Sequence, residues 1–259
     1  MLSYAAKTDV GNRRDNNEDC YLASPELSLW VMADGVGGHD AGEIASKIAC
    51  DVIKSKVEEG QALAGAINDA HQAIKSSSEQ GVGRPGMATT VVVLLVKDNL
   101  YRIAWVGDSR GYLWRDKNLP QLTHDQSLVQ RLLDENLITQ EEAYHHPRRN
   151  LVTQALGQDS LNNVEVEVVE GEFKDGDKII LCSDGLTDYI RDTQITQLLI
   201  DNNDESVLVN ELVSAALGTE GKDNITVMAI KHSAQEMNNT QSILTKLMTY
   251  VRAWLQKKS

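Results

Sequence analysis

The sequence predicts an α+β fold in which largely antiparallel sheets are covered by helices. Apolar runs rich in β-branched residues recur along the chain, and two helical segments follow one another between them. The order never becomes the regular strand–helix alternation typical of a parallel sheet. The 259 residues suffice for one large domain, and 41% hydrophobic with 24% charged residues excludes a disordered or disulfide-knotted chain.

Each element is expected from its local pattern. Strands are predicted where apolar, β-rich runs occur, at about 18–23, 28–33, 88–96, 100–106, 110–115, 164–169, 177–183 and 224–230. Helices are predicted where apolar residues repeat on one stripe, at 41–57, 62–76, 126–134, 192–201 and 205–217. In the first helix, Ile44, Ile48 and Val52 stand four residues apart, which gives it a core-facing side.

Charge and cysteine content exclude several classes of protein. A net charge of −13 argues against a nucleic-acid partner, which requires a basic surface. The apolar run 91–96 is far shorter than the roughly 20 residues of a membrane span, and the first residues lack the pattern of a signal peptide. Cys20, Cys50 and Cys182 are odd in number and form no CxxC pair, so we expect reduced thiols in a soluble, cytoplasmic protein.

Acidic residues stand next to glycine or asparagine at the ends of predicted strands. They are Glu18 and Asp19, Asp34 before Gly35, Asp108 after Gly107, Asp184 before Gly185 with Asp188 nearby, and Asp223 before Asn224. Asp-Gly is common turn chemistry, which remains the alternative at any single place. Turn chemistry does not explain why these acids, taken together, adjoin strands whose sequences look fully buried. Oxygen donors without paired histidines or cysteines favour Mg²⁺ or Mn²⁺ over zinc.

The order and spacing of these motifs carry a specific resemblance. The strings are 11–19 (GNRRDNNED), 34–46 (DGVGGHDAGEIAS), 86–90 (GMATT), 107–111 (GDSRG), 122–125 (LTHD), 150–157 (NLVTQALG), 183–185 (SDG) and 223–224 (DN). Together they resemble the metal-dependent protein phosphatase family, the type 2C serine/threonine phosphatases, in their compact bacterial form, over about residues 3–231. The resemblance implies an αββα sandwich, two antiparallel sheets face to face and flanked by helices, with a metal centre in a cleft at one end.

The resemblance also implies a ligand set for two Mg²⁺ or Mn²⁺ ions. Asp34 is expected to bridge the ions, the Gly35 carbonyl to hold one, Asp184 and Asp223 to hold the other, and Glu18 to act through bound water. A metal-bridging water would attack phosphoserine or phosphothreonine directly. Asp108 and Asp188 are candidates, with Asp184, for a third and weaker ion; the alternative is that these acids hydrogen-bond a loop.

Two further residues are candidates for substrate chemistry. Arg14 is expected to clamp the substrate phosphate, because on an extended segment it projects to the same face as Glu18; the alternative is a surface arginine paired with Asp15 or Glu18. His39 is the candidate general acid, because Val36 occupies the position where many relatives carry a histidine. A packed or helix-capping histidine is the alternative for His39.

The chain is expected to divide into a catalytic domain, 1–232, and an extension, 233–259. Residues of about 124–155 would form a flap over the cleft, where Arg148 and Arg149 either attract acidic phosphopeptides or are simply solvated. The extension combines a polar hinge, 233–241, with a basic amphipathic helix, 242–258. That helix would dock on its own domain, on a partner or on a membrane surface.

The expected function is a protein serine/threonine phosphatase that opposes a bacterial serine/threonine kinase, with the kinase or its substrates as partners. One alternative is a phosphatase-like domain kept as a binding module, which the intact Glu18, Asp34, Asp184 and Asp223 disfavour. Another is a different substrate, such as a phosphorylated anti-anti-sigma partner or a small phosphomonoester.

Overall fold

The computed structural model describes residues 1–37 and 41–233. The strands are β1 (Leu2–Asp9), β2 (Asp19–Ser24), β3 (Leu29–Val36), β4 (Ala88–Thr89), β5 (Val91–Lys97), β6 (Leu100–Val106), β7 (Arg110–Trp114), β8 (Glu167–Glu172), β9 (Lys178–Cys182) and β10 (Ile225–His232). The helices are α1 (Ala41–Glu58), α2 (Leu63–Glu79), α3 (Leu128–Asp134), α4 (Gln140–Tyr144), α5 (Asp184–Thr187), α6 (Asp192–Asp201) and α7 (Glu205–Leu217).

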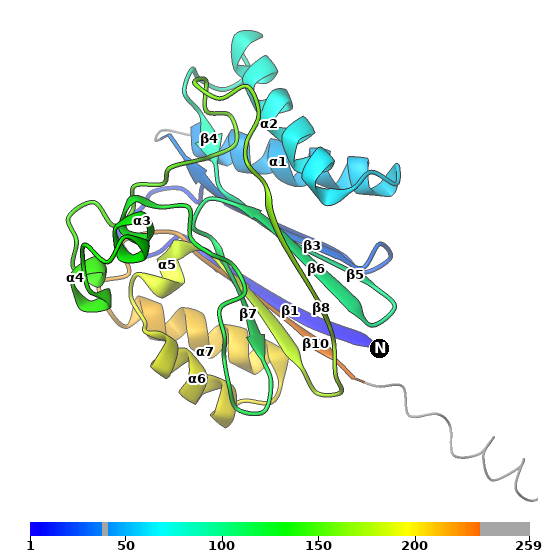
Figure 1. Ribbon diagram of the computed structural model, residues 1–259, viewed down its shortest axis with the longest axis vertical. Coiled ribbons are helices and arrows are strands. Elements are labelled where there is room, and N and C mark those ends of the chain that lie inside the picture. The colour runs from blue at the N-terminus through cyan, green and yellow to red at the C-terminus, as the bar shows by residue number, and fades with distance from the viewer. Residues whose placement is uncertain (38–40, 234–259) are drawn as a thin grey trace, which may run out of the picture.

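The strands form two antiparallel sheets. One has four strands in the order β1-β10-β9-β7, and the other has six, in the order β2-β3-β5-β6-β8 with β4 beside β3. Figure 1 shows α1 and α2 over the six-stranded sheet and α6 and α7 over the four-stranded sheet, with α3 and α4 together at one end. The predicted α+β class and αββα sandwich are confirmed.

Three apolar layers hold the sandwich together, one between the sheets and one under each helix pair. Strand β3 shows how they are built, because Leu29 and Val31 face the α1–α2 layer whereas Trp30 and Met32 face the layer between the sheets. Alternate side chains of a strand point to opposite faces. A central strand with both faces covered therefore has no polar side, which explains the uninterrupted apolar runs in the sequence.

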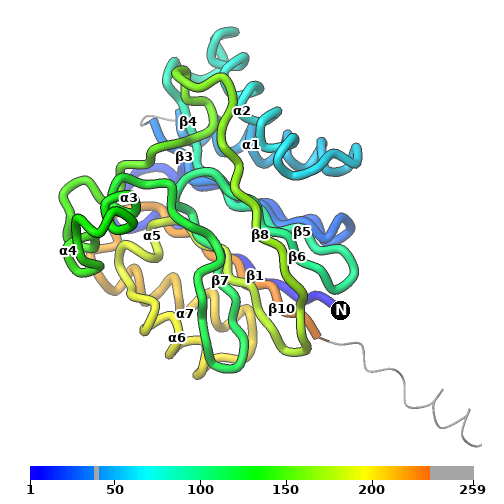
Figure 2. The backbone as a smooth tube through the Cα atoms, in the orientation of Figure 1, coloured from blue at the N-terminus to red at the C-terminus, as the bar shows by residue number. Residues whose placement is uncertain are grey.

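The structure also differs from the expected elements. Strand β1 is not predicted from the sequence, because its two alanines and few β-branched residues give a weak strand pattern. It forms by pairing with β10 from the other end of the chain, with Leu2 opposite His232, and the two run side by side in Figure 2. The run expected as one strand, 88–96, is split at Thr90 into β4 and β5.

The remaining sequence-based expectations about the fold concern membranes and the C-terminus. In the described part of the chain, no helix is long and apolar enough to cross a bilayer. The expected C-terminal helix, 242–258, and the hinge beyond Ser233 lie outside the described residues.

Candidate metal centre

The strand-end acids gather around one cleft, with a volume of about 300 Å³. Of the predicted site residues, those that line it are Arg14, Glu18, Asp34, Gly35, Asp108, Asp184 and Asp223. Asp188 does not line this cleft but lines a neighbouring pocket of about 260 Å³, which shares Asp108 and Asp184 with it. His39 lies outside the described residues. Segments from both sheets and both ends of the chain thus meet at one end of the sandwich.

The end of β3 is fixed by its neighbours. The Asp34 carbonyl accepts hydrogen bonds from the Thr90 amide (2.8 Å) and the Thr89 hydroxyl (2.9 Å), which is why the expected strand 88–96 breaks there. A side chain on Gly35 would place its Cβ 2.3 Å from the Gly42 carbonyl oxygen and 2.6 Å from that of Glu18. Only glycine permits this close approach of the β3 end to the start of α1.

Asp19 joins the two sheets beneath the cleft. One oxygen of its carboxylate accepts hydrogen bonds from the hydroxyls of Ser183 (3.0 Å) and Thr226 (2.6 Å), which belong to the four-stranded side. Its other oxygen, Oδ1, is buried and has no hydrogen-bond partner, and the same holds for Oε1 of the neighbouring Glu18. A buried carboxylate oxygen without a donor is costly unless a cation or ordered water satisfies it.

The acids of the cleft repel one another. Burial, followed by the nearby charges of Asp19 and Asp184, raises the pKa of Asp34 well above its ordinary value. Burial raises the pKa of Asp19 to about 6 and, together with the charge of Asp125, raises that of Asp108 to about 7. Burial and neighbouring carboxylates likewise raise the pKa of Asp184. Such a group of acids is fully ionised near neutral pH only when positive charge is added.

The donors fit Mg²⁺ or Mn²⁺. In the described part of the chain, no three His, Cys, Asp or Glu side chains converge closely enough to form a ready-made metal cluster. The carboxylates instead stand around the cleft. Mg²⁺ usually keeps several waters and takes only one or two protein carboxylates, and oxygen donors also suit Mn²⁺. The unpartnered oxygens of Glu18 and Asp19 and the raised carboxylate pKa values are therefore consistent with hydrated divalent ions.

Arg14 lies at the rim of the cleft. Its Nη2 atom is 2.8 Å from both carboxylate oxygens of Asp223, and its Nη1 atom is 3.9 Å from Glu18 Oε2. The segment that carries it is a series of turns, so the expected extended geometry was wrong, although Arg14 and Glu18 do approach one another. The side chain remains 43% exposed, which leaves its guanidinium accessible from the cleft.

Asn224 fixes the chain segment at this rim. The sequence analysis named it only as the neighbour of Asp223 and gave it no role of its own. Its side-chain oxygen accepts a hydrogen bond from the Glu18 amide (2.8 Å), and its side-chain nitrogen donates to the carbonyls of Val10 (2.9 Å) and Asn16 (3.0 Å). It is buried, with 3% of its surface exposed. Asn224 therefore holds the segment that carries Arg14 and Glu18 against the neighbouring Asp223.

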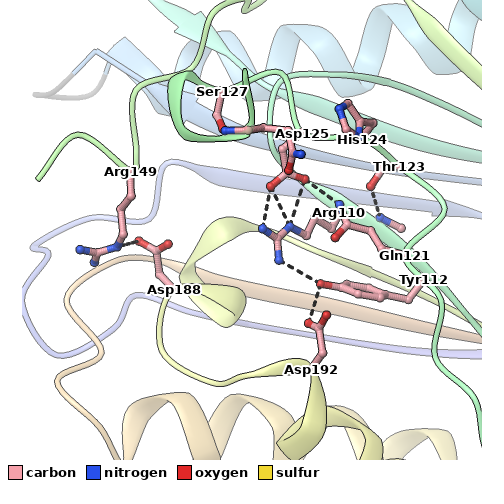
Figure 3. A network of polar contacts seen from close by, with 12 residues as sticks. Arg110, Tyr112, Gln121, Thr123, His124, Asp125, Ser127, Arg149, Asp188 and Asp192 are labelled. Carbon is pink, nitrogen blue, oxygen red and sulfur yellow. Dashed lines mark hydrogen bonds and ion pairs between the residues drawn. The ribbon is translucent and has the colours of Figure 1, made fainter. Parts of the chain in front are cut away.

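The turn that presents Asp108 is held by Gln126. The Gly107 amide donates to the Gln126 side chain (3.0 Å), and the Gln126 amide donates to the Gly107 carbonyl (2.9 Å). Close by, Arg110 binds Asp125 through Nε (2.9 Å) and Nη2 (2.6 Å), both to Oδ2, as Figure 3 shows.

On the opposite side, the expected flap contacts the acids directly. Asp188 accepts hydrogen bonds from Arg149 Nε (3.2 Å) and from Asn150 Nδ2 (2.8 Å), and the same Asn150 nitrogen is 3.3 Å from Asp184 Oδ2. Figure 3 shows Arg149 and Asp188 facing each other. Arg149 thus pairs with a carboxylate of the candidate third-ion site, a contact that the sequence did not predict.

Comparison with known proteins places this geometry in a family. The family model described as protein phosphatase 2C matches residues 12–214. A serine/threonine protein phosphatase PstP of Mycobacterium tuberculosis is 38% identical over 251 residues, covering 94% of this chain and 48% of that protein, so the chain spans about half of that relative's length. A serine/threonine phosphatase stp of Listeria monocytogenes is 34% identical over 91% of this chain and 98% of its own length.

Solved structures agree with this placement. The catalytic domain of serine threonine protein phosphatase PstP, solved in complex with two manganese ions, superimposes with a TM-score of 0.81 at 35% identity. The match covers 90% of this chain and 99% of that one. The family model covers every acid that lines the cleft except Asp223, and the relatives and the solved structure each match about nine-tenths of the chain. The chain therefore belongs to the protein phosphatase 2C family.

Proposed function

We propose that this chain is a Mg²⁺- or Mn²⁺-dependent protein serine/threonine phosphatase, with residues 1–232 as its catalytic domain. The observation that carries the proposal is the cleft itself, where buried acids on strand ends leave oxygens without protein donors and an arginine stands at the rim. The family and the manganese-bound relative support it.

The carboxylates supply the cation-binding half of the chemistry. Asp34, Asp184 and Asp223 would hold two ions together with the Gly35 carbonyl, and Glu18 would contribute through bound water. When bound, such ions offset the negative charge of a phosphomonoester and make water acidic enough to attack it. The raised carboxylate pKa values suit this role, because a cation lowers them again and so keeps the acids ionised.

Arg14 would bind the substrate phosphate. A planar guanidinium can donate two parallel hydrogen bonds to phosphate oxygens, and Arg14 already contacts both oxygens of the Asp223 carboxylate through Nη2. Asn224 would act as a positioning residue, because it fixes the segment of Arg14 and Glu18 without lining the cleft.

Asp108, Asp184 and Asp188 would hold a third ion more weakly. Asp188 is already engaged by Arg149 and Asn150, so a cation there has to compete with existing contacts. These contacts also support the assignment of about 124–155 as the flap, because they connect it to the acids.

The leaving alkoxide needs a proton. Of the histidines in the described residues, none lines the cleft, so His39 stays our candidate for the general acid. His39→Ala should slow turnover most for substrates whose leaving groups are poorly acidic. Equal losses for good and poor leaving groups would remove His39 from that role.

The substrates would be phosphoserine and phosphothreonine in proteins, and the enzyme would oppose a bacterial serine/threonine kinase. We place it in the cytoplasm, because its cysteines are free thiols, which suits a reducing compartment.

The test is phosphate release from a phosphothreonine peptide, with EDTA and then with Mn²⁺ restored, for the wild type, Asp34→Asn and Asp98→Asn. Asp98 lies in the exposed turn between β5 and β6, away from the cleft, and serves as the matched control. Loss of a direct ligand should exceed the roughly 10–100-fold cost of losing an outer partner of a metal site. A folded wild type that is inactive with either metal would contradict the proposal and favour a binding module.

A further inference from the structure

Two cysteines from different elements meet behind the cleft. Cys20 is the second residue of β2, and Cys50 lies in α1, which packs against that strand. The Cys50 thiol donates to the Cys20 main-chain carbonyl over 3.7 Å, so the two residues lie against one another. Both side chains belong to the apolar layer between the six-stranded sheet and its helices.

The two sulfurs differ in accessibility. Cys50 is fully buried, whereas Cys20 is half-buried at the edge of the same layer and is therefore the sulfur that solvent reaches. The third cysteine, Cys182, is buried in the separate layer under α6 and α7. The chain thus contains one adjacent pair of thiols and one isolated thiol.

Accessibility favours Cys20 as the reactive member of the pair. The half-buried Cys20 sulfur is open to an oxidant in solution, whereas Cys50 and Cys182 are fully buried. Cys20 should therefore react first, and the adjacent Cys50 is the thiol that can then react with it.

We propose that Cys20 and Cys50 form a peroxide-reactive dithiol that closes reversibly into an intramolecular disulfide between β2 and α1. The oxidant is a hydroperoxide. The Cys20 thiolate attacks one peroxide oxygen, the O–O bond breaks and Cys20 becomes a sulfenic acid while the other oxygen leaves as water. The Cys50 sulfur then attacks the Cys20 sulfur, the S–O bond breaks and a second water leaves with the Cys50 proton.

The balance is two thiols and one hydrogen peroxide giving one disulfide and two waters, with two electrons passing from the sulfurs to the peroxide. The new bond would lie directly behind the metal-binding segment. Asp19 immediately precedes Cys20, and the Ser46 hydroxyl, one turn before Cys50 on α1, already donates to the Glu18 carbonyl (2.6 Å). The disulfide would add a covalent link beside that hydrogen bond.

The experiment treats the reduced, full chain with hydrogen peroxide in the presence of a chelator, stops the reaction with catalase and alkylates the remaining thiols after denaturation. Trypsin cleaves after Arg14, Lys47 and Lys54, which separates Cys20 and Cys50 into different peptides. We expect a linked pair of peptides, 15–47 with 48–54, that a reductant separates. Cys182 in the same sample should remain reduced and be alkylated, because it is buried in a separate layer.

Variants assign the role of each sulfur. Cys50→Ser should leave Cys20 as a sulfenic acid that dimedone labels, whereas Cys20→Ser should leave Cys50 reduced, and Cys182→Ser should leave the cross-link unchanged. The wild-type result does not depend on how well any variant folds. The proposal is overturned if Cys20 and Cys50 remain as reduced as Cys182, if the cross-link joins two chains, or if Cys20 in Cys50→Ser is not labelled.

Discussion

The two sides of the cleft hold their carboxylates in different ways. On the six-stranded sheet, Glu18 and Asp19 lie at the start of β2, and each has a buried oxygen that no protein group satisfies. On the flap side, Asp188 is bound by Arg149 and Asn150. A cation entering the sheet side adds partners to oxygens that lack them, whereas a cation entering the flap side has to replace partners. The first side should therefore bind ions tightly and the second weakly.

The largest effect of this difference should appear when the ions are removed. Ligands that bind only the folded state stabilise it by about 2.7 kcal/mol at 100 times their Kd. We expect thermal denaturation followed by circular dichroism to give a higher Tm with Mn²⁺ than with EDTA, and the difference should grow from pH 5 to pH 8. Equal changes of Tm with pH in Mn²⁺ and in EDTA would contradict the proposed site.

The sign of the pH effect follows from the raised pKa values. Folding raises the pKa of Asp19 from 3.8 to about 6 and that of Asp108 from 3.8 to about 7. Between the unfolded and folded values the native state binds more protons than the unfolded state, so the stability of the metal-free protein falls as pH rises from about 4 to about 7. Cations compete with those protons, and their stabilising effect therefore increases over the same range.

A smaller effect is expected from Asn224→Ala. The substitution leaves the buried Glu18 amide without its acceptor and releases the Arg14 segment, at a cost of about 1–3 kcal/mol of unfolding free energy. Mn²⁺ affinity should fall about tenfold, as is typical for loss of a partner outside the ligand set. Urea denaturation and calorimetric titration measure the two effects.

The matched control is Asn210→Ala, which removes an exposed amide bonded only within its own helix, to the Ser206 carbonyl. Loss of stability in Asn224→Ala without a change in Mn²⁺ affinity would restrict Asn224 to a structural role. If Asn224→Ala raised KM and left kcat unchanged, the main influence of Asn224 would be on Arg14 and not on the acids.

The smallest effect is expected on the flap side. Arg149→Gln removes a half-exposed ion pair with Asp188, and such pairs contribute about 0.2–1 kcal/mol. Because the arginine competes with the cation, the weakest Mn²⁺ binding event should become about 1.4-fold to fivefold tighter, which corresponds to the same energy range. Arg148→Gln, at an exposed neighbouring position, is the control. Weaker binding in Arg149→Gln would show that the arginine supports the ion site.

Much of the fold and of the cleft follows from the sequence. Buried strands read as apolar runs, and acids beside glycine or asparagine at their ends point to a shared edge, so Asp34, Asp108, Asp184 and Asp223 could be singled out. These are local patterns. Gly35 could be recognised for the same reason, because the close approach of two backbone segments leaves no room for a side chain.

The features that the sequence did not show depend on contacts between residues that are far apart in the chain. Strand β1 exists because β10 pairs with it, and Asn224 matters because its side chain reaches Val10, Asn16 and Glu18. Arg14 pairs with Asp223, more than 200 residues away, and not with its neighbour Asp15. Propensity and periodicity contain no information about such contacts. The roles assigned to His39 and to the C-terminal helix remain predictions.

The most direct measurement is calorimetric titration of the chelated full chain with Mn²⁺, for the wild type, Asp34→Asn and Asp188→Asn. The difference between the two sides of the cleft predicts that Asp34→Asn abolishes the tight binding events, whereas Asp188→Asn removes only the weak one. Tight binding that survives in Asp34→Asn, or is lost in Asp188→Asn, would contradict the proposed difference between the two sides.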